Sequence, residues 1–454
     1  YRMGCRPPPE SGGQPVTARY LAVKALMRQE QNGYANLVLD SELKACKPPL
    51  SPRDAAFASG IFYTVLERRS LLDWILAQFS KRPLEKLDAP VRAILRAGLA
   101  QAKFMDVPLP AAVNESVKLT RALGKSSAAG MVNAVLRRAA GAAVSESDFP
   151  DPLERLSVYY CLSRPVAELL YAQFGAEAFP LAAAFYRKPK TTIRVNTLRT
   201  DDASLTALLQ AEGHTVSTGP WPGALIVDFA GSPAASAAFQ KGLFHVQGLA
   251  SQFAALCVDA RPGQQVLDLC AAPGGKSFTV AERMRGEGSV CSFDLYPSRT
   301  ALIEQGAARL GITSVYPAVA DASCYNEAYG KADRVLCDVP CSGFGIVRRK
   351  PEIRYKPQGE VDKLPDLQYL ILRNAARYVK KGGRLVYSTC TLNPEENEAV
   401  CLRFLQENAS FRPVAPDLPE QLNARKDDNG FFTLFPEAGG RDGFYIAVFQ
   451  EVSV

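Results

Sequence analysis

The chain has 454 residues, of which 47% are hydrophobic and 22% charged, a composition that is ordinary for a globular protein. No apolar run approaches the roughly 18 residues that a membrane-spanning helix needs, and the first residues lack the apolar core of a secretion signal. The net charge of +7 is mild for this length, and the length itself predicts two to four domains of roughly 100 to 200 residues each.

The eleven cysteines are spread along the chain without the paired spacing of a metal site. Several of them lie inside apolar runs: Cys257, Cys270, Cys291 and Cys337. This usage predicts a reducing, cytoplasmic setting and no bound metal. Because only two histidines are present, histidine-based catalysis and zinc chemistry have few available residues. Cysteine, aspartate and lysine are therefore the expected reactive groups.

The front of the chain is expected to be helical. Residues 1–16 contain RPPP and SGGQP and are predicted to form a flexible arm. From residue 17 to 142 the apolar residues recur at helical spacing, and prolines separate the segments. The stretch GAAVSESDFPDP at 141–152 then breaks the pattern and marks a linker. We therefore expect a compact all-helical domain over 17–142.

Residues 143–241 are predicted to hold this linker and a small subdomain. The segment KTTIRVNTLRT at 190–200 alternates Thr192, Arg194 and Asn196 with apolar residues, a pattern that predicts a strand with one basic, polar face. The basic clusters RKPK at 187–190 and RRK at 348–350 would suit the phosphates of a polyanion. Solvated faces explain such clusters equally well.

From residue 242 to 454 short apolar runs alternate with helix-length segments, which predicts a doubly wound α/β fold with a mostly parallel sheet. The expected strands are Gln265 to Leu269, Ser289 to Phe293, Val315 to Val319, Arg334 to Cys337 and Arg384 to Ser388. Two further runs, Phe431 to Phe435 and Phe444 to Phe449, are expected to form a closing antiparallel hairpin.

The first of these strands leads into AAPGGK at 271–276, where such folds bind cofactors. The motif is neither the dinucleotide pattern GxGxxG nor a phosphate loop, so a nucleoside cofactor without a pyrophosphate is favoured. The glycines allow close approach of a ligand, and a helix start offers N–H donors to a carboxylate such as that of S-adenosylmethionine. Asp294, after the second strand, suits ribose hydroxyls, and Asp321, after the third, could reach an adenine amino group. Each acid alone is more often a turn former.

The fourth and fifth strands lead into DVPCSGFG at 338–345 and STCTLNPEEN at 388–397. Cys341 and Cys390 are thus expected at the carboxyl ends of adjacent strands, although a lone cysteine is usually a small buried hydrophobe. Asn393 with Glu396 resembles a helix cap, and a helix start nearby would favour a thiolate at Cys390.

A thiolate and a carboxylate together suit one kind of methyl transfer. Carbon 5 of a pyrimidine is a poor nucleophile, and addition of a thiolate at carbon 6 activates it. Asp338 would bind the cytosine edge and, if protonated, deliver a proton to the ring nitrogen. The second cysteine would help to remove the carbon 5 proton and expel the first sulfur. The spacing alone leaves open which cysteine attacks.

The motifs DLCAAPGGKS, DVPCSGFG and YSTCTLNPEENE, with KGLFHVQG and DGFYIAVF, closely resemble those of bacterial RNA cytosine-5 methyltransferases. AAVNESVKL at 111–119 and MVNAVLRR at 131–138 make the front domain similar to the RNA-binding antitermination factor NusB. The resemblance covers nearly all of the chain after residue 16. It implies S-adenosylmethionine as cofactor, 16S rRNA as partner, and a monomer that methylates carbon 5 of a cytosine.

The family pattern implies that Cys390 is the nucleophile and that Cys341 aids product release, with Asp338 as the third catalytic residue. The implied cofactor-binding residues are Cys270, Ala271, Ala272, Pro273, Gly274, Gly275, Lys276, Asp294, Arg299, Asp321 and Asp338. The expected RNA-binding residues are Arg194, Asn196, Arg199, Arg348, Arg349 and Lys350. One departure is Gly248, where relatives usually carry an acid.

Three other readings compete. A non-catalytic RNA-binding or assembly factor is disfavoured by the joint presence of Cys341, Cys390, Asp338 and Lys276. An amino-group methyltransferase would need an Asp/Asn-Pro-Pro-aromatic loop, which DVPC does not supply. A dehydrogenase is disfavoured by the missing GxGxxG.

Overall fold

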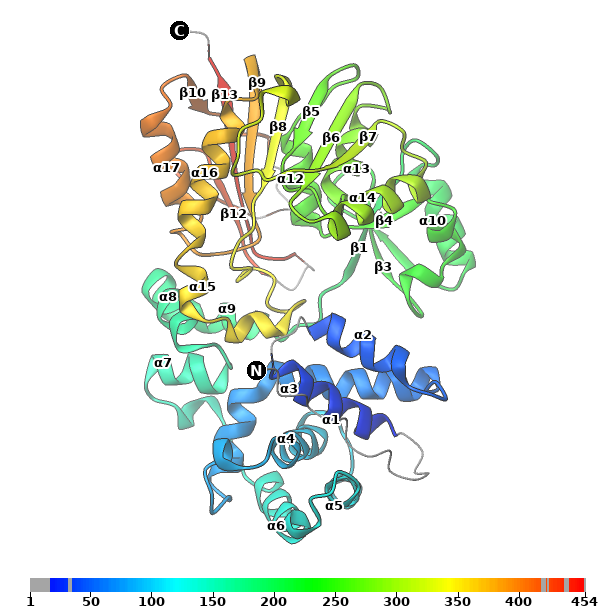
Figure 1. Ribbon diagram of the computed structural model, residues 1–454, viewed down its shortest axis with the longest axis vertical. Helices are drawn as coiled ribbons and strands as arrows, with labels where there is room; N and C mark the ends of the chain where they lie inside the picture. The colour runs from blue at the N-terminus through cyan, green and yellow to red at the C-terminus, as the bar shows by residue number, and fades with distance from the viewer. Residues whose placement is uncertain (1–16, 32–34, 418–421, 423, 437–440, 453–454) are drawn as a thin grey trace, which may run out of the picture. The chain divides into compact units, whose positions relative to one another are not determined.

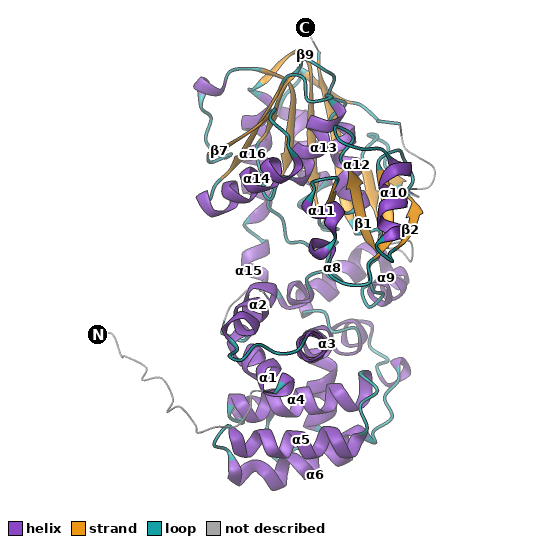
Figure 2. Ribbon diagram, turned by 90° about the vertical axis from the view of Figure 1, so that its right-hand side faces the viewer, coloured by secondary structure: helices purple, strands orange, loops and turns teal. Residues whose placement is uncertain are grey.

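The computed structural model describes residues 17–31, 35–417, 422, 424–436 and 441–452, so the arm expected at 1–16 lies outside the described residues. The chain divides into two compact units. The helical unit comprises Tyr1–Glu168 and Lys350–Arg354, and the sheet unit comprises Leu169–Arg349 and Tyr355–Val454. Figure 1 labels their elements, and Figure 2 shows that the strands belong to the sheet unit.

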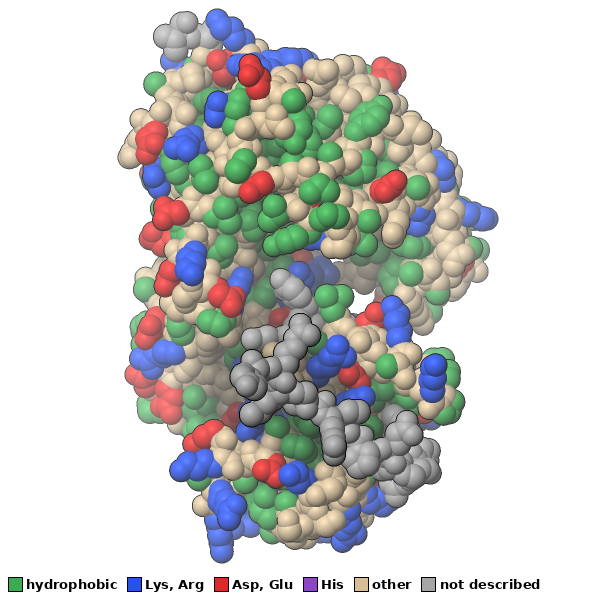
Figure 3. Space-filling model, viewed as in Figure 1, with side chains coloured by type: hydrophobic (Ala, Val, Ile, Leu, Met, Phe, Trp, Pro, Cys, Tyr) green, Lys and Arg blue, Asp and Glu red, His purple; other side chains and the backbone are tan. Residues whose placement is uncertain are grey.

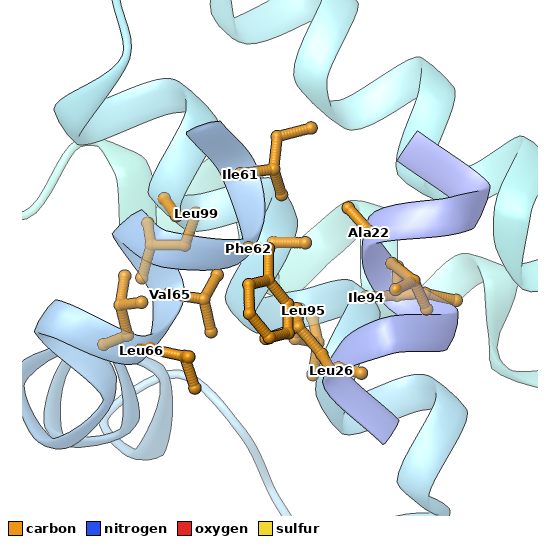
Figure 4. Close-up of a cluster of buried hydrophobic side chains, with 14 of the residues drawn as sticks. Ala22, Leu26, Ile61, Phe62, Val65, Leu66, Ile94, Leu95 and Leu99 are labelled. Carbon is orange, nitrogen blue, oxygen red and sulfur yellow. The ribbon is translucent and has the colours of Figure 1, made fainter. Parts of the chain in front are cut away.

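The helical unit is built from amphipathic helices, as expected. Its elements are α1 (Ala18–Gln29), α2 (Ala35–Ala45), α3 (Pro52–Ala77), α4 (Ala89–Phe104), α5 (Leu109–Ala122), α6 (Ala129–Ala140), α7 (Pro152–Glu154) and a π-helical turn (Arg155–Tyr159), with 3-10 turns at Leu84–Lys86, Ser126–Ala128 and Glu146–Asp148. Prolines lie in the first turns of α3, α4 and α5, where the missing N–H breaks no helical hydrogen bond. Figure 4 shows apolar side chains of α1, α3 and α4 meeting in its core.

Two buried arginines link parts of the helical unit through hydrogen bonds. Arg96 donates to both carboxylate oxygens of Asp73 at 2.7 Å and also to Glu30, which ties α4 to α3 and to the residue after α1. Arg354, from the segment Lys350–Arg354, is fully buried. Its Nη1 donates to the carbonyl oxygen of Tyr160 at 2.9 Å, and its own carbonyl accepts the N–H of Ser163 at 2.7 Å.

The sheet unit begins with a small antiparallel sheet in the order β2-β3-β1-β4. Its strands are β1 (Thr191–Val195), β2 (Thr215–Thr218), β3 (Ala224–Asp228) and β4 (Phe244–Val246). The helices of this region are α8 (Arg164–Phe174), α9 (Ala178–Ala184), α10 (Asp202–Ala211) and α11 (Ala237–Gln240), with 3-10 turns at Gly175–Glu177 and Pro233–Ala235. Because β4 pairs with β1, this sheet continues past the expected boundary at 241.

The larger sheet runs β11-β12-β13-β9-β8-β5-β6-β7, with β10 paired to β13. Its strands are β5 (Gln265–Asp268), β6 (Ser289–Asp294), β7 (Val315–Val319), β8 (Ala332–Asp338), β9 (Val379–Thr389), β10 (Phe411–Pro413), β11 (Arg425–Lys426), β12 (Phe432–Leu434) and β13 (Phe444–Glu451). Neighbours from β7 to β9 are parallel, and the β13 to β9 and β12 to β13 pairs are antiparallel. The expected doubly wound sheet with a C-terminal antiparallel pair is confirmed.

Helices cover both faces of this sheet. Val266 packs with α12 (Leu249–Cys257), α13 (Gly275–Arg283) and α14 (Pro297–Leu310), whereas the next residue, Leu267, packs with α16 (Leu364–Ala376) and α17 (Glu398–Glu407). Two 3-10 turns, Glu327–Tyr329 and Pro351–Tyr355, and the short helix α15 (Gln358–Val361) complete the described elements. Burial on both faces explains why these strands read as continuous apolar runs.

Two findings concern the molecular surface. Among the described residues no helix is long and apolar enough to cross a membrane. On the face drawn in Figure 3, the described lysines and arginines are interspersed with acidic side chains.

Candidate active site

The loop after β5 is shaped by a glycine that no other residue could replace without strain. Gly274 has φ +108°, and a Cβ there would lie 2.4 Å from the ring of Phe278. The N–H of Gly274 donates to the carbonyl of Ala271 at 2.7 Å, and the N–H of Ala271 donates to Phe293 at 2.7 Å. The loop therefore closes tightly and starts α13 at Gly275, which brings the N–H groups of a helix start to the carboxyl edge of the sheet.

A bridge joins this loop to the end of β6. Asp294 is 4% exposed, and its carboxylate accepts the N–H of Tyr296 at 3.3 Å and lies 3.5 Å from Nη2 of Arg299. The same Nη2 donates to the carbonyl of Ala272 at 3.1 Å. Arg299 thus joins the AAPGGK segment at 271–276, which we call the cofactor loop, to the end of β6.

Asp321, two residues after β7, serves a local turn. Its Oδ1 accepts the N–H of Ser323 at 2.9 Å and the hydroxyl of Ser323 at 2.6 Å, and these hydrogen bonds lower the pKa of the Asp321 carboxyl. The carboxylate is exposed. Its contact with an adenine therefore stays a prediction beside this established role as a turn former.

Asp338 lies at the point where the strand order reverses, between β5 and β8. Its Oδ2 is 2.6 Å from Nζ of Lys276, and its Oδ1 accepts the hydroxyl of Ser388 at 2.7 Å. Lys276 Nζ also lies 5.3 Å from the ring centroid of Phe444. The fold therefore brings the cofactor loop, β8 and β9 together at one carboxylate, where open α/β sheets bind ligands.

The two motif cysteines are in contact. Sγ of Cys341 lies 3.1 Å from Sγ of Cys390, although 49 residues separate them. The hydrogen bond to Cys390 and burial raise the pKa of the Cys341 thiol well above its ordinary value. Cys341 therefore keeps its proton next to the second sulfur, so one thiol can transfer a proton at the site where the other reacts.

The expected helix cap beside Cys390 is wrong. Helix α17 begins at Glu398 with Asn397 as its cap, whereas Asn393 closes a turn by accepting the N–H of Glu395 at 3.2 Å. Asn397 accepts the hydroxyl of Thr389 at 2.6 Å. No helix start adjoins Cys390 within this described segment.

The strand predicted over this segment forms as β1, and its polar face is buried. Arg194 is 3% exposed and Asn196 is 0% exposed. The Nε of Arg194 donates to Glu282 at 3.1 Å, and the amide of Asn196 donates to the carbonyls of Gly242 and Leu310, both at 2.8 Å. Both side chains therefore bond inside the protein, Arg194 to α13 and Asn196 to the end of α14, and their contacts with RNA stay a prediction. Arg199 is exposed, and its role stays a prediction.

The RRK cluster at 348–350 also contains both buried and exposed residues. Arg348 is buried and Arg349 is half-buried at its side chain, and they pair with the two oxygens of Asp442 at 2.9 Å and 2.6 Å. An RNA contact by Arg348 is therefore not supported, whereas Lys350 is exposed. A Cβ on Gly248 would lie 3.3 Å from Asp442 Oδ2, so an acid at 248 would face a carboxylate that is already present.

Sequence reasoning missed several buried polar residues. Asp268 accepts the hydroxyl of Ser277 at 2.7 Å, and burial raises the pKa of its carboxyl to about 7. Asp442 stands inside a motif noted in the sequence but received no role, and Glu396 was expected only as part of a helix cap. Gln368 carries no local signal at all. Among the described residues no group of three or more His, Cys, Asp or Glu could hold a metal ion.

Comparison with known families follows this division. A family described as NusB matches residues 16–141, a ferredoxin-like domain of RsmF/B-like methyltransferases matches 166–232, and the family 16S rRNA methyltransferase RsmB/F matches 255–450. The last match contains the cofactor loop and both cysteines.

Relatives match along nearly the whole chain. The probable ribosomal RNA small subunit methyltransferase B of Bacillus subtilis is 35% identical over 95% of this chain and 98% of its own length. The Thermus thermophilus ribosomal RNA small subunit methyltransferase B is 34% identical over 96% and 98%.

Solved structures agree with this fold. A protein named PH0851 is 26% identical with a TM-score of 0.81, over 96% of this chain and 99% of its own. NSun6 from Pyrococcus horikoshii, solved with SFG, has a TM-score of 0.58 at 22% identity over 63% of this chain and 97% of its own.

Proposed function

Because the chain belongs to the family of ribosomal RNA small subunit methyltransferases B, we propose that it methylates carbon 5 of one cytosine in 16S rRNA, at the position numbered 967, through a covalent adduct with Cys390. The contact between the Cys341 and Cys390 sulfurs carries this proposal. Methylation of an oxygen or an exocyclic nitrogen needs no thiol, whereas carbon 5 of cytosine needs a nucleophile at carbon 6.

The residues of the cofactor loop fit S-adenosylmethionine, the cofactor of this enzyme class. Gly274 lets the loop turn at positive φ against Phe278, and the start of α13 suits the carboxylate of the cofactor. Asp294 at the end of β6 would bind the ribose hydroxyls, with Arg299 holding the acid in place. When bound, S-adenosylmethionine supplies the methyl group as an electrophile.

The chain's own residues would then act in order. Cys390 gives up its thiol proton and its Sγ adds to carbon 6 as a thiolate, and the displaced electron pair makes carbon 5 nucleophilic. Asp338, held as an acceptor between Lys276 and Ser388, accepts from the cytosine amino group, and the Lys276 ammonium is the adjacent source for the ring nitrogen's proton. The target base must leave its stack to reach this edge. This differs from the expectation that Asp338 itself delivers the proton, because both of its neighbours are donors.

Release needs the second sulfur. Removal of the carbon 5 proton reforms the double bond between carbons 5 and 6, and the electron pair of the carbon–sulfur bond leaves with Cys390. Cys341 gives its proton to that leaving sulfur and takes up the carbon 5 proton, and the ring nitrogen returns its proton to Lys276. Both cysteines end as thiols, and the thiol proton that Cys390 lost on addition is the net proton released. The Sγ to Sγ distance of 3.1 Å supports this exchange.

The first test measures transfer of labelled methyl from S-adenosylmethionine to unmodified 16S rRNA, followed by nucleoside digestion and mapping of the modified position. We expect labelled 5-methylcytidine from the wild type and none from Cys390→Ala, with cofactor affinity unchanged. Normal turnover by Cys390→Ala would reject the adduct. Cofactor binding without transfer to any RNA would instead favour a non-catalytic RNA-binding factor, and transfer elsewhere would indicate a different RNA target.

A second test isolates product release. Cys341→Ala should form the Cys390 adduct but fail to resolve it, so that enzyme and RNA migrate together in denaturing electrophoresis. Absence of the adduct would remove the release role. A monomer acting in the cytoplasm, with the exposed Arg199 and Lys350 contacting RNA, completes the proposal.

A further inference from the structure

Glu396 is a fully buried acid beside the two cysteines. Its Oε2 accepts the backbone N–H of Ser342 at 2.8 Å and the side-chain amide of Gln368 at 2.9 Å. Its Oε1 accepts the side-chain amide of Asn393 at 2.9 Å. A buried carboxylate is retained only when its oxygens are well hydrogen-bonded, and these three donors, a backbone N–H and two side-chain amides, are neutral groups.

These contacts fix the residues on either side of Cys341. Ser342, which follows it, is held by Glu396 through its N–H. Pro340, which precedes it, is held through its carbonyl by the same Nε2 of Gln368 at 2.9 Å. Glu396 and Gln368 therefore clamp the Cys341 backbone from both sides.

The same cluster reaches the Cys390 loop. Asn393, bound to Glu396, lies three residues after Cys390, and the hydroxyls of Ser342 and Thr391 are 2.6 Å apart. The carbonyl of Cys390 accepts the N–H of Gly345 at 2.9 Å. The two loops come from β8 and β9 and have no covalent link near the site, so these buried bonds set the distance between the sulfurs.

We propose that Glu396 is a positioning residue for product release, which holds the Cys341 thiol against Cys390 so that the covalent adduct can resolve. This inference rests on the proposed function.

The chain supplies a matched control. Glu395 precedes Glu396 and is exposed, so Glu395→Gln makes the same chemical change outside the cluster. Glu396→Gln keeps the side-chain size but replaces one acceptor oxygen by an amide donor, which cannot accept from Ser342, Gln368 and Asn393 together.

The experiment forms the adduct between full-length enzyme and unmodified 16S rRNA in the presence of S-adenosylmethionine and follows its decay by denaturing electrophoresis. For Glu396→Gln we expect adduct formation and cofactor affinity close to wild type, with decay slowed about tenfold or more, since small displacements of reacting groups cost that much. Glu395→Gln should match the wild type.

Decay at the wild-type rate in Glu396→Gln would overturn the inference, and so would joint loss of cofactor binding and adduct, which would mean a merely structural role. Gln368→Met keeps the acid and removes the second arm of the clamp, so it should also slow decay selectively if the first variant fails to fold. Failure of the proposed function would look different: the wild type itself would yield no 5-methylcytidine and no adduct would form in Cys341→Ala.

Discussion

Replacing Gly274 by alanine is predicted to destabilise the sheet unit by about 2–6 kcal/mol. A non-glycine residue at this positive φ costs roughly 1–3 kcal/mol. The added Cβ would lie 2.4 Å from the ring of Phe278, and the same ring also packs closely against Gly306, where a Cβ would lie 2.6 Å from it. The ring therefore has little room to move. Forcing extra volume into such a packed site costs about 1–3 kcal/mol more.

The assay is denaturant unfolding of the full chain, with S-adenosylmethionine affinity measured in parallel. Gly275→Ala is the control, since its φ is not positive and its Cβ would meet nothing nearer than 3.6 Å. It should be neutral or slightly stabilising, by up to about 1 kcal/mol. Equal stability of the two variants would show that the Gly274 conformation and the Phe278 contact do not constrain this loop.

Three other changes follow from buried charges. Arg96→Met should lower the stability of the helical unit by about 3–5 kcal/mol, because it leaves Asp73 without its guanidinium; unchanged thermal unfolding would contradict this. Arg194→Met should destabilise the sheet unit by roughly 3 kcal/mol through loss of the Glu282 pair, and wild-type stability with weaker rRNA binding would instead restore the RNA-contact expectation. For Asp268 the folded pKa of about 7 exceeds the unfolded value of 3.8, so the folded state binds more protons between these pH values and stability falls as pH rises through them. Asp268→Asn should remove this pH dependence from the denaturation midpoints. An unchanged pH dependence would mean that other groups cause it.

The sequence was enough to predict the helices and strands, but it did not predict which polar side chains are buried. Apolar runs separated by helix-length segments correctly predicted the parallel strands. The positions of Cys341 and Cys390 after adjacent strands indicated that the two residues lie close together. Arg194 and Asn196 were misread because period-two alternation distinguishes two faces of a strand but does not say that one of them is open to water. In β1 the polar face packs against α13 and α14, where Glu282 and backbone carbonyls satisfy it.

Glu396 and Gln368 show a second limit. Their partners lie 54 and 28 residues away in the chain, so no local spacing pairs them. Asn393 looked like a helix cap because an Asn that accepts a nearby N–H does the same in a turn as at a helix start. The helix begins instead at Glu398, after Asn397, whose side chain accepts the hydroxyl of Thr389.

The position of Arg354 bears on how the protein is made. This arginine completes the interior of the helical unit, yet it bonds Tyr160 across 194 residues of sequence. When the first 168 residues have left the ribosome, the helical unit still lacks Arg354. That side chain becomes available only after β8 has been translated. Domains generally fold as they emerge, from the N-terminus onward. Here the helical unit can complete its interior only after most of the sheet unit has been synthesised. A fragment that ends at residue 168 would therefore lack part of that interior and would not be an independent domain.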